Sequence, residues 1–238
     1  MKLFATLMAV VLLAATAPAA HAIMDPTPGT QIYFVGSVQD TVSMGQSPHL
    51  CGSALIADSW LITAKRCVEG KGPESFNVRV GSTYYGTRGQ LVPAAAIVPH
   101  PTSDVALIKL SSRADATPVA IADQPAPPGT DGIVLGWGQN CPEAGCGGPN
   151  AHLQQVKGHT EPNSVCGADK DRLCTRYPNN GGPCFGDEGG PMVSGVEGDY
   201  RLIGLVPSRS RFGVSCSQGS AALIEVSALR EWITKYTG

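Results

Sequence analysis

The sequence is poor in charged and aromatic residues. Of its 238 residues 15% are charged and 6% are aromatic, and the formal net charge at pH 7 is only −2. Proteins that bind nucleic acid or anionic membranes usually carry a basic excess, so this charge balance gives no reason to expect either partner. Internal repeats, low-complexity tracts and coiled-coil heptads are also absent from the sequence, which excludes solenoid and fibrous folds.

Long apolar runs are absent too, except for one at the N-terminus. Lys2 supplies a positive start, residues 3–17 carry no charge, and Ala20-His-Ala22 fits the small-x-small pattern of a signal cleavage site. A membrane anchor is the alternative, but the run is shorter than the roughly 20 residues that a spanning helix needs. We therefore predict a signal peptide over residues 1–22 and a secreted, extracellular protein with no membrane segment after signal removal.

Cysteine is present in an even number. In an exported chain this favours disulfide bonds. Zinc is the competing interpretation, but Cys141 and Cys146 are five residues apart and no histidine-rich cluster accompanies them. The eight cysteines are Cys51, Cys67, Cys141, Cys146, Cys166, Cys174, Cys184 and Cys216.

Glycine and proline, with 29 and 19 residues, provide many turn signals between short apolar runs, which is typical of β-strands. Residues 122–131 are proline-rich and polar, and we predict that they link two halves of similar size. Leu229, Trp232 and Ile233 have helical spacing, so a C-terminal helix is expected over residues 226–236 with Ser227 as its N-cap. The expected strands are residues 31–38, 53–56, 60–64, 76–80, 105–110, 132–136, 200–206 and 221–226.

Four stretches carry a more specific signal, and they follow one another in a known order. They are Cys51-Gly-Ser-Ala-Leu-Ile with Trp60-Leu-Ile-Thr-Ala-Lys-Arg-Cys67, His100-Pro-Thr-Ser-Asp-Val-Ala-Leu, Gly136-Trp-Gly138 with Leu153-Gln-Gln-Val156, and Cys184-Phe-Gly-Asp-Glu-Gly-Gly-Pro191. The first, second and fourth resemble the segments that carry histidine, aspartate and the nucleophile in chymotrypsin/trypsin-like serine proteases. The third resembles the opening of the second barrel in that family.

The resemblance spans nearly all of residues 23–238 and implies an all-β fold. The expected architecture is two six-stranded antiparallel β-barrels, at about residues 23–121 and 132–226, with a helix at residues 227–237. The resemblance also implies a set of disulfides. These are Cys51–Cys67, Cys166–Cys174 and Cys184–Cys216, with Cys141–Cys146 left as a local clip.

The chemistry of this family needs a hydroxyl nucleophile, an imidazole that takes its proton, and a carboxylate that orients the imidazole. Asp104 fills the aspartate position, but Arg66 stands in the histidine position and Glu188 in the serine position. A guanidinium stays protonated and has no acceptor lone pair, and a carboxylate has no hydroxyl. The resemblance therefore implies a catalytically inactive homologue.

Other residues do not replace the missing pair. His100 lies four residues before Asp104, where the family often has His-Pro without a catalytic role, and no serine lies within residues 186–191. Three further histidines match no catalytic position of the family; they are His49, His152 and His159.

Further positions of the family are partly retained. Gly186 and the backbone N–H of Glu188 match its oxyanion hole, which the backbone can build whatever the side chain. Asp187 matches the aspartate that pairs with the free N-terminus of mature members, so we expect it to pair with Ile23 after signal cleavage. The alternative is that Ile23 begins a flexible end.

The substrate pocket departs from the trypsin pattern. Gly182 stands where an acidic residue would select lysine or arginine, so trypsin-like specificity is not expected. Pro207-Ser208-Arg209 stands where the family has Ser-Trp-Gly, and Arg209 would crowd the pocket mouth.

These observations favour a secreted pseudoprotease that acts by binding an extracellular protein, such as a protease or an inhibitor, as a monomer and without cofactor or metal. A serine-type hydrolase with residual or altered activity is the alternative. A metal site of Asp104, Asp187 and Glu188 is a third possibility. Because the three triad positions converge in this fold, we also expect Arg66 to bridge Asp104 and Glu188 as an ion triad. The alternative is that Arg66 extends into solvent while Glu188 points into the open pocket.

Overall fold

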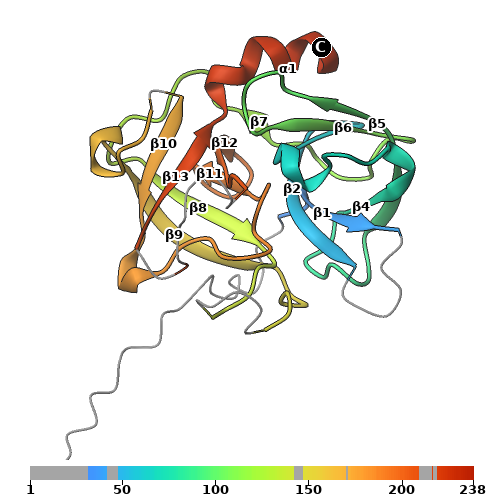
Figure 1. Cartoon of the computed structure of the whole chain (residues 1–238), viewed down its shortest axis with the longest axis horizontal. Coiled ribbons are helices and arrows are strands. Elements are labelled where there is room, and N and C mark those ends of the chain that lie inside the picture. The colour runs from blue at the N-terminus through green and yellow to red at the C-terminus, as the bar shows by residue number, and fades with distance from the viewer. Residues whose placement is uncertain (1–31, 42–47, 142–146, 170, 209–215, 217–218) are drawn as a thin grey trace, which may run out of the picture.

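Two β-barrels lie side by side in the computed structural model, with the C-terminal helix α1 (Arg230–Thr237) above them in the view of Figure 1. The structure describes residues 32–41, 48–141, 147–169, 171–208, 216 and 219–238. Trp60 contacts the ring of Tyr236, and His100 contacts that of Trp232. Helix α1 therefore packs against the first barrel.

The first barrel is closed in the strand order β1-β2-β3-β6-β5-β4, and every neighbouring pair is antiparallel. In β4 the side chains alternate between the barrel interior and its surface, as the pleat of a strand requires. Phe76, Val78 and Val80 are buried, whereas Asn77 and Arg79 are partly exposed. The strands are β1 (Val35–Asp40), β2 (His49–Ala57), β3 (Trp60–Thr63), β4 (Phe76–Val80), β5 (Gln90–Pro99) and β6 (Ala106–Leu110).

The second barrel has the order β11-β8-β9-β10-β13-β12 and is closed by pairing of β11 with β12. The short strand β7 (Ala120–Ile121) adds to β12 in parallel. The expectation of two six-stranded antiparallel barrels with a short C-terminal helix is thus confirmed. The strands are β8 (Asp131–Gly136), β9 (Gln154–Glu161), β10 (Arg172–Arg176), β11 (Pro191–Ser194), β12 (Arg201–Leu205) and β13 (Ser220–Glu225).

Strands β5, β7, β9, β10 and β11 were not expected from the sequence. Strand β9, for example, reads Gln-Gln-Val-Lys-Gly-His-Thr-Glu and has no continuous apolar run. Burial and pairing by neighbouring strands stabilise such segments, and local pattern does not record those neighbours. Short 3₁₀ turns connect the elements; they are Lys65–Cys67, Pro73–Ser75, Asn163–Val165, Pro178–Asn180 and Ser227–Leu229.

The predicted start of the C-terminal helix is wrong. Ser227 does not cap α1, because a 3₁₀ turn over Ser227–Leu229 precedes the helix. The Ser227 hydroxyl donates to Glu225 Oε1 at 2.9 Å instead. Burial raises the pKa of the Glu225 carboxyl, while its bonds to Ser227 oppose that shift.

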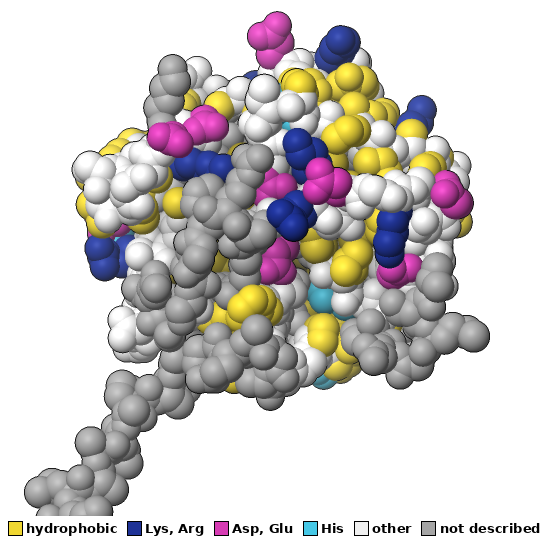
Figure 2. Space-filling model, in the orientation of Figure 1, with side chains coloured by type: hydrophobic (Ala, Val, Ile, Leu, Met, Phe, Trp, Pro, Cys, Tyr) yellow, Lys and Arg dark blue, Asp and Glu magenta, His cyan; other side chains and the backbone are white. Residues whose placement is uncertain are grey.

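Three of the four expected disulfides are confirmed: Cys51–Cys67, Cys166–Cys174 and Cys184–Cys216. The expected Cys141–Cys146 clip lies outside the described residues at Cys146. No helix in the described part of the chain has the length and apolar character needed to cross a bilayer. On the face drawn in Figure 2, basic and acidic side chains are interspersed rather than gathered by sign.

The two barrels meet where glycines allow close backbone approach. The N–H of Gly52 in β2 donates to Glu188 O across the seam at 2.8 Å. A Cβ on Gly52 would lie 2.7 Å from Gly190 Cα. Gly189 has φ +76°, and a Cβ on it would clash with Gly52 O and Thr63 Oγ1. Glycine tolerates both the close backbone contact and the positive φ, so these two positions allow the loop around residue 188 to pack directly against the first barrel.

Candidate functional site

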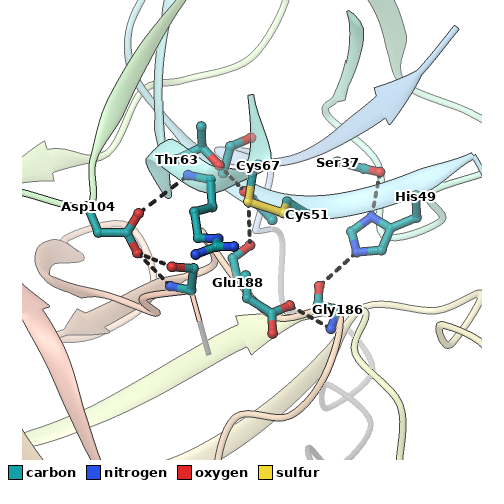
Figure 3. Close-up of a disulfide and its surroundings, with 12 residues drawn as sticks. Ser37, His49, Cys51, Thr63, Cys67, Asp104, Gly186 and Glu188 are labelled. Atoms are coloured by element: carbon teal, nitrogen blue, oxygen red, sulfur yellow. Dashed lines mark hydrogen bonds between the residues drawn. A yellow bond between two sulfur atoms is a disulfide. The ribbon is translucent and has the colours of Figure 1, made fainter. Parts of the chain in front are cut away.

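Asp104 lies at the seam, in the turn that precedes β6, and is only 4% exposed. Its Oδ2 accepts from the Ser208 N–H at 2.8 Å and from the Ser208 hydroxyl at 2.5 Å, while Oδ1 accepts from the Arg66 N–H at 3.4 Å (Figure 3). Ser208 follows β12, so these bonds join the two barrels. The carboxylate is therefore buried with donors on both oxygens, and no imidazole is among them.

Arg66 lies in the 3₁₀ turn Lys65–Cys67, and its side chain is exposed. The expected ion triad is wrong: among the described residues, which include all three members, Arg66 reaches Asp104 through its backbone N–H and forms no ion pair with either carboxylate. The physical reason is that Ser208 already satisfies Asp104 and a backbone N–H satisfies Glu188. The guanidinium keeps its hydration instead of paying the cost of burial.

Glu188 is half-buried, and its side chain turns back along its own loop. Oε2 accepts from the Gly186 N–H at 2.7 Å (Figure 3). Its backbone O accepts from Gly52 as described above, and Cys67 Sγ lies 3.9 Å from the same oxygen. Gly186 has φ +95°, a conformation that favours glycine. The Glu188 carboxylate thus accepts a hydrogen bond from Gly186, one of the two residues that the resemblance assigns to an oxyanion hole.

His49 is a site residue whose importance the sequence did not reveal. Its Nε2 lies 2.9 Å from Gly186 O and its Nδ1 lies 2.8 Å from Ser37 Oγ (Figure 3). A carbonyl oxygen only accepts, so Nε2 carries the proton and Nδ1 accepts from the Ser37 hydroxyl. Burial lowers the His49 pKa to about 4, and the bond to Gly186 opposes this shift. Its place two residues before Cys51, on the strand that reaches the seam, is the sequence signal that could have indicated it.

Asp187 is 1% exposed, and backbone donors hold both of its oxygens. Oδ1 accepts from the Gly138 N–H at 2.8 Å, and Oδ2 accepts from the Cys184 N–H at 2.7 Å. A Cβ at Gly138 would lie 2.5 Å from the Asp187 carboxyl carbon, so the glycine permits this approach. The expected pairing with Ile23 stays a prediction, because Ile23 lies outside the described residues.

The base of the expected pocket is packed by an aromatic ring. A Cβ on Gly182 would lie 3.2 Å from Tyr177 Cδ2, and one on Gly158 would lie 2.6 Å from Tyr177 Cδ1. Tyr177 is 4% exposed, and its hydroxyl lies 2.9 Å from Thr175 Oγ1. Burial raises its pKa. Gly182 therefore brings no charge to this base, and a tyrosine ring lies beside it.

The structure describes one of the other two expected pocket residues. Pro207, which follows β12 and precedes Ser208 in the chain, is buried. Arg209 lies outside the described residues. The sequence predicted only that this segment is altered, whereas the structure shows that Ser208 binds the Asp104 carboxylate.

A metal centre finds no support in the geometry. Within the described ranges, no three or more His, Cys, Asp and Glu side chains gather closely enough to hold an ion. Asp104, Asp187 and Glu188 each direct at least one carboxylate oxygen to a backbone N–H. The possible three-carboxylate site is therefore not assembled.

Comparison with known proteins decides the family. The profile of the family described as Trypsin matches residues 26–233, which is most of the chain. The chain belongs to the trypsin family. A trypsin-family chain accounts for the two barrels, for the three described disulfides and for the order of the four sequence stretches.

Individual relatives within the trypsin family are moderately similar. A trypsin of Phaedon cochleariae is 31% identical, with 79% of each chain covered. A trypsin of Sarcophaga bullata is 28% identical, covering 79% of this chain and 78% of its own. A vitellin-degrading protease of Bombyx mori is 29% identical, covering 86% of this chain and 83% of its own. These trypsin-family relatives place the chain in a family of serine endopeptidases.

Proposed function

We propose that this trypsin-family protein is secreted, does not hydrolyse peptide bonds, and acts by binding another extracellular protein. The observation that carries the proposal is the chemistry around the buried Asp104 carboxylate. The aspartate position is kept, but Arg66 offers no proton acceptor and Glu188 offers no hydroxyl. Asp104 accepts from Ser208 and from a backbone N–H, so it has no imidazole to orient.

The size of the expected loss follows from what these groups do in serine proteases. In subtilisin, which uses the same chemistry on another fold, loss of the serine or the histidine alone lowers turnover by about 10⁶. Glu188 could attack only as a carboxylate, and that attack would form an anhydride with an amine leaving group and no base to assist. Hydrolysis by this route is expected to be undetectable.

The test of inactivity uses the mature protein with two independent probes. A serine-directed fluorophosphonate should give no covalent adduct, and casein and a panel of chromogenic peptides should stay intact. Recombinant trypsin mixed at trace level into a parallel sample calibrates the contamination limit. Stoichiometric labelling, or casein cleavage that co-purifies with the protein through every step, would instead support a hydrolase of altered mechanism.

Secretion and binding need separate tests. Signal cleavage after Ala22 would give a mature chain that starts at Ile23, which N-terminal sequencing of the culture medium checks directly. Loops on a rigid β scaffold are suited to recognition, and the described disulfides suit an oxidising compartment. Cross-linking of the mature protein in the medium of secreting cells should capture a protease, an inhibitor or another extracellular protein. A monomer that captures no protein under native conditions would contradict the binding role.

A further inference from the structure

We propose that a cleft where the two barrels meet, lined by three aromatic rings and a carboxylate, binds an arginine side chain of a partner protein. None of the triad positions lines this cleft. The inference rests on the proposed function in one respect only, which is that the arginine belongs to a bound extracellular protein.

The cleft is small and is built from segments that lie far apart in the chain. It has a volume of about 350 Å³ and is lined by residues 33–34, 117–120, 197–198 and 200–201. The first segment leads into β1 of the first barrel, and the last ends at the start of β12 in the second. Binding pockets span roughly 300–1,000 Å³, so this cleft matches a single side chain better than a large ligand.

Three aromatic rings line the cleft, and they belong to Tyr33, Phe34 and Tyr200. The Phe34 and Tyr200 rings meet edge to face, with centroids 6.2 Å apart and an interplanar angle of 69°. Within the described residues, no group forms a hydrogen bond with the hydroxyl of Tyr33 or Tyr200. Aromatic faces attract cations and a phenol oxygen accepts hydrogen bonds, so this lining favours a cation that carries N–H groups.

The charges around the cleft also favour a cation. Arg201, the basic residue of the lining, is held by Asp199, with Nη1 2.6 Å from Oδ1. Arg113, on the loop that enters the cleft from the first barrel, is held by Asp58 at 3.1 Å. Glu197 adds a negative charge to the lining. An incoming cation therefore meets two neutralised bases and a carboxylate.

Glu197 and Tyr200 act on the same part of the cleft. Burial raises the pKa of the Tyr200 hydroxyl, and the negative charge of Glu197 raises it further. The carboxylate is therefore close enough for its field to reach the phenol. A guanidinium is planar and carries five N–H donors, so it can stack on a ring while it donates to the carboxylate and to the phenol oxygen. A lysine ammonium is a compact, strongly hydrated charge that cannot stack, which favours arginine as the occupant.

Exposed apolar side chains at the rim indicate that the arginine comes from a protein. Tyr33 is 42% exposed, and Val196, which directly precedes Glu197, is 70% exposed. Protein interfaces are enriched in aromatic residues and arginine, and they cover apolar groups of this kind. A free amine in the cleft would leave Val196 in water.

The experiment titrates the secreted, ¹⁵N-labelled protein and follows the backbone amides of Tyr33, Gly198 and Tyr200 by nuclear magnetic resonance. Three probes share the form acetyl-Gly-X-Gly-amide, in which X is arginine, lysine or citrulline. Citrulline has the shape of arginine without its charge. Choline is the fourth probe, because it represents a free small cation. All titrations are made at equal, low ionic strength.

The arginine peptide should shift these amides with a Kd of about 1–10 mM, as expected for a few cation–π contacts and one exposed charge pair. The lysine peptide and choline should bind at least about 3-fold more weakly, and the citrulline peptide at least about 10-fold more weakly. E197Q and Y33A should each weaken binding of the arginine peptide by about 2- to 5-fold. E69Q removes the same charge as E197Q from an exposed position outside the cleft and should bind like wild type.

Three results would overturn the inference: amides that the arginine peptide does not shift, another probe that binds as tightly as arginine, or E197Q and Y33A proteins that bind like E69Q. None of these results depends on hydrolysis. Protease activity in the wild-type sample would refute the proposed function alone, and unshifted amides would refute this inference alone.

Discussion

Removal of the Asp104 carboxylate should destabilise the protein far more than removal of the Arg66 side chain. In D104A, the buried N–H and hydroxyl of Ser208 lose an acceptor that lies at 2.8 and 2.5 Å. Each buried donor left unsatisfied costs about 1–3 kcal/mol, whereas the third bond, at 3.4 Å, is long and adds little. Because alanine also removes a buried charge, part of this cost is offset, and we expect a net loss of about 2–4 kcal/mol.

The two matched variants sharpen this prediction. D104N keeps an oxygen that can accept from Ser208, so its loss should be about half that of D104A, roughly 1–2 kcal/mol. R66A removes an exposed side chain that forms no ion pair with any described residue, so stability should change by no more than about 0.5 kcal/mol.

Urea unfolding with the disulfides intact, followed by tryptophan fluorescence, measures these differences as shifts in midpoint at constant slope. Thermal unfolding should show a fall of about 5–15 °C for D104A, as expected for a chain of this size. If R66A were as unstable as D104A, the guanidinium would be part of a buried ion triad after all. If D104A unfolded like wild type, the carboxylate would not join the two barrels, and the reasoning would be refuted.

Three further predictions concern the seam between the barrels and the expected substrate pocket. Burial keeps the folded-state pKa of His49 near 4, against an ordinary 6.5. The His49 contribution to the free energy of unfolding is therefore complete above pH 6.5, and about 3 kcal/mol of it is lost as the pH falls toward 4. H49Q should flatten that part of a pH–stability curve, and an unchanged slope would contradict the burial. G189A should lower the free energy of unfolding in urea by about 2–4 kcal/mol, because its new Cβ would clash with neighbouring backbone at φ +76°. G70A, at φ +78° with open space around the new Cβ, should lower it by about 1 kcal/mol. Equal losses would show that the two barrels can move apart at Gly189. R66H/E188S should raise cleavage of peptide substrates little, because the pocket base is uncharged and packed by a tyrosine ring; robust cleavage would show an intact pocket.

The position of the three triad residues could be predicted from the sequence, but their contacts could not. Motifs around Cys67, His100 and Cys184 locate Arg66, Asp104 and Glu188 because each motif is contiguous in the chain. The charges of the three then predict a bridge, which the structure contradicts. The missing information was Ser208, whose hydroxyl is 104 residues away from Asp104 in the chain.

The contact between Glu188 and Gly186 shows a different limit. The two residues are only two positions apart, yet the bond depends on a backbone conformation of φ +95° at Gly186. His49, which is 137 residues away from Gly186, holds the carbonyl of that glycine. Local sequence does not specify a dihedral angle that a distant side chain stabilises.

The sequence by itself determined the identity of the groups at the triad positions. Through the resemblance that its short motifs carry to the trypsin family, it also predicted the two-barrel fold and the three described disulfides. Only the tertiary structure decided which donor satisfies which carboxylate. A hydrogen bond forms only within about 3 Å and in a narrow range of directions. Where the barrels meet, that distance is set by glycines at Gly52 and Gly189 and by the packing of both cores, so Ser208 and Gly186, and not Arg66, became the partners of Asp104 and Glu188.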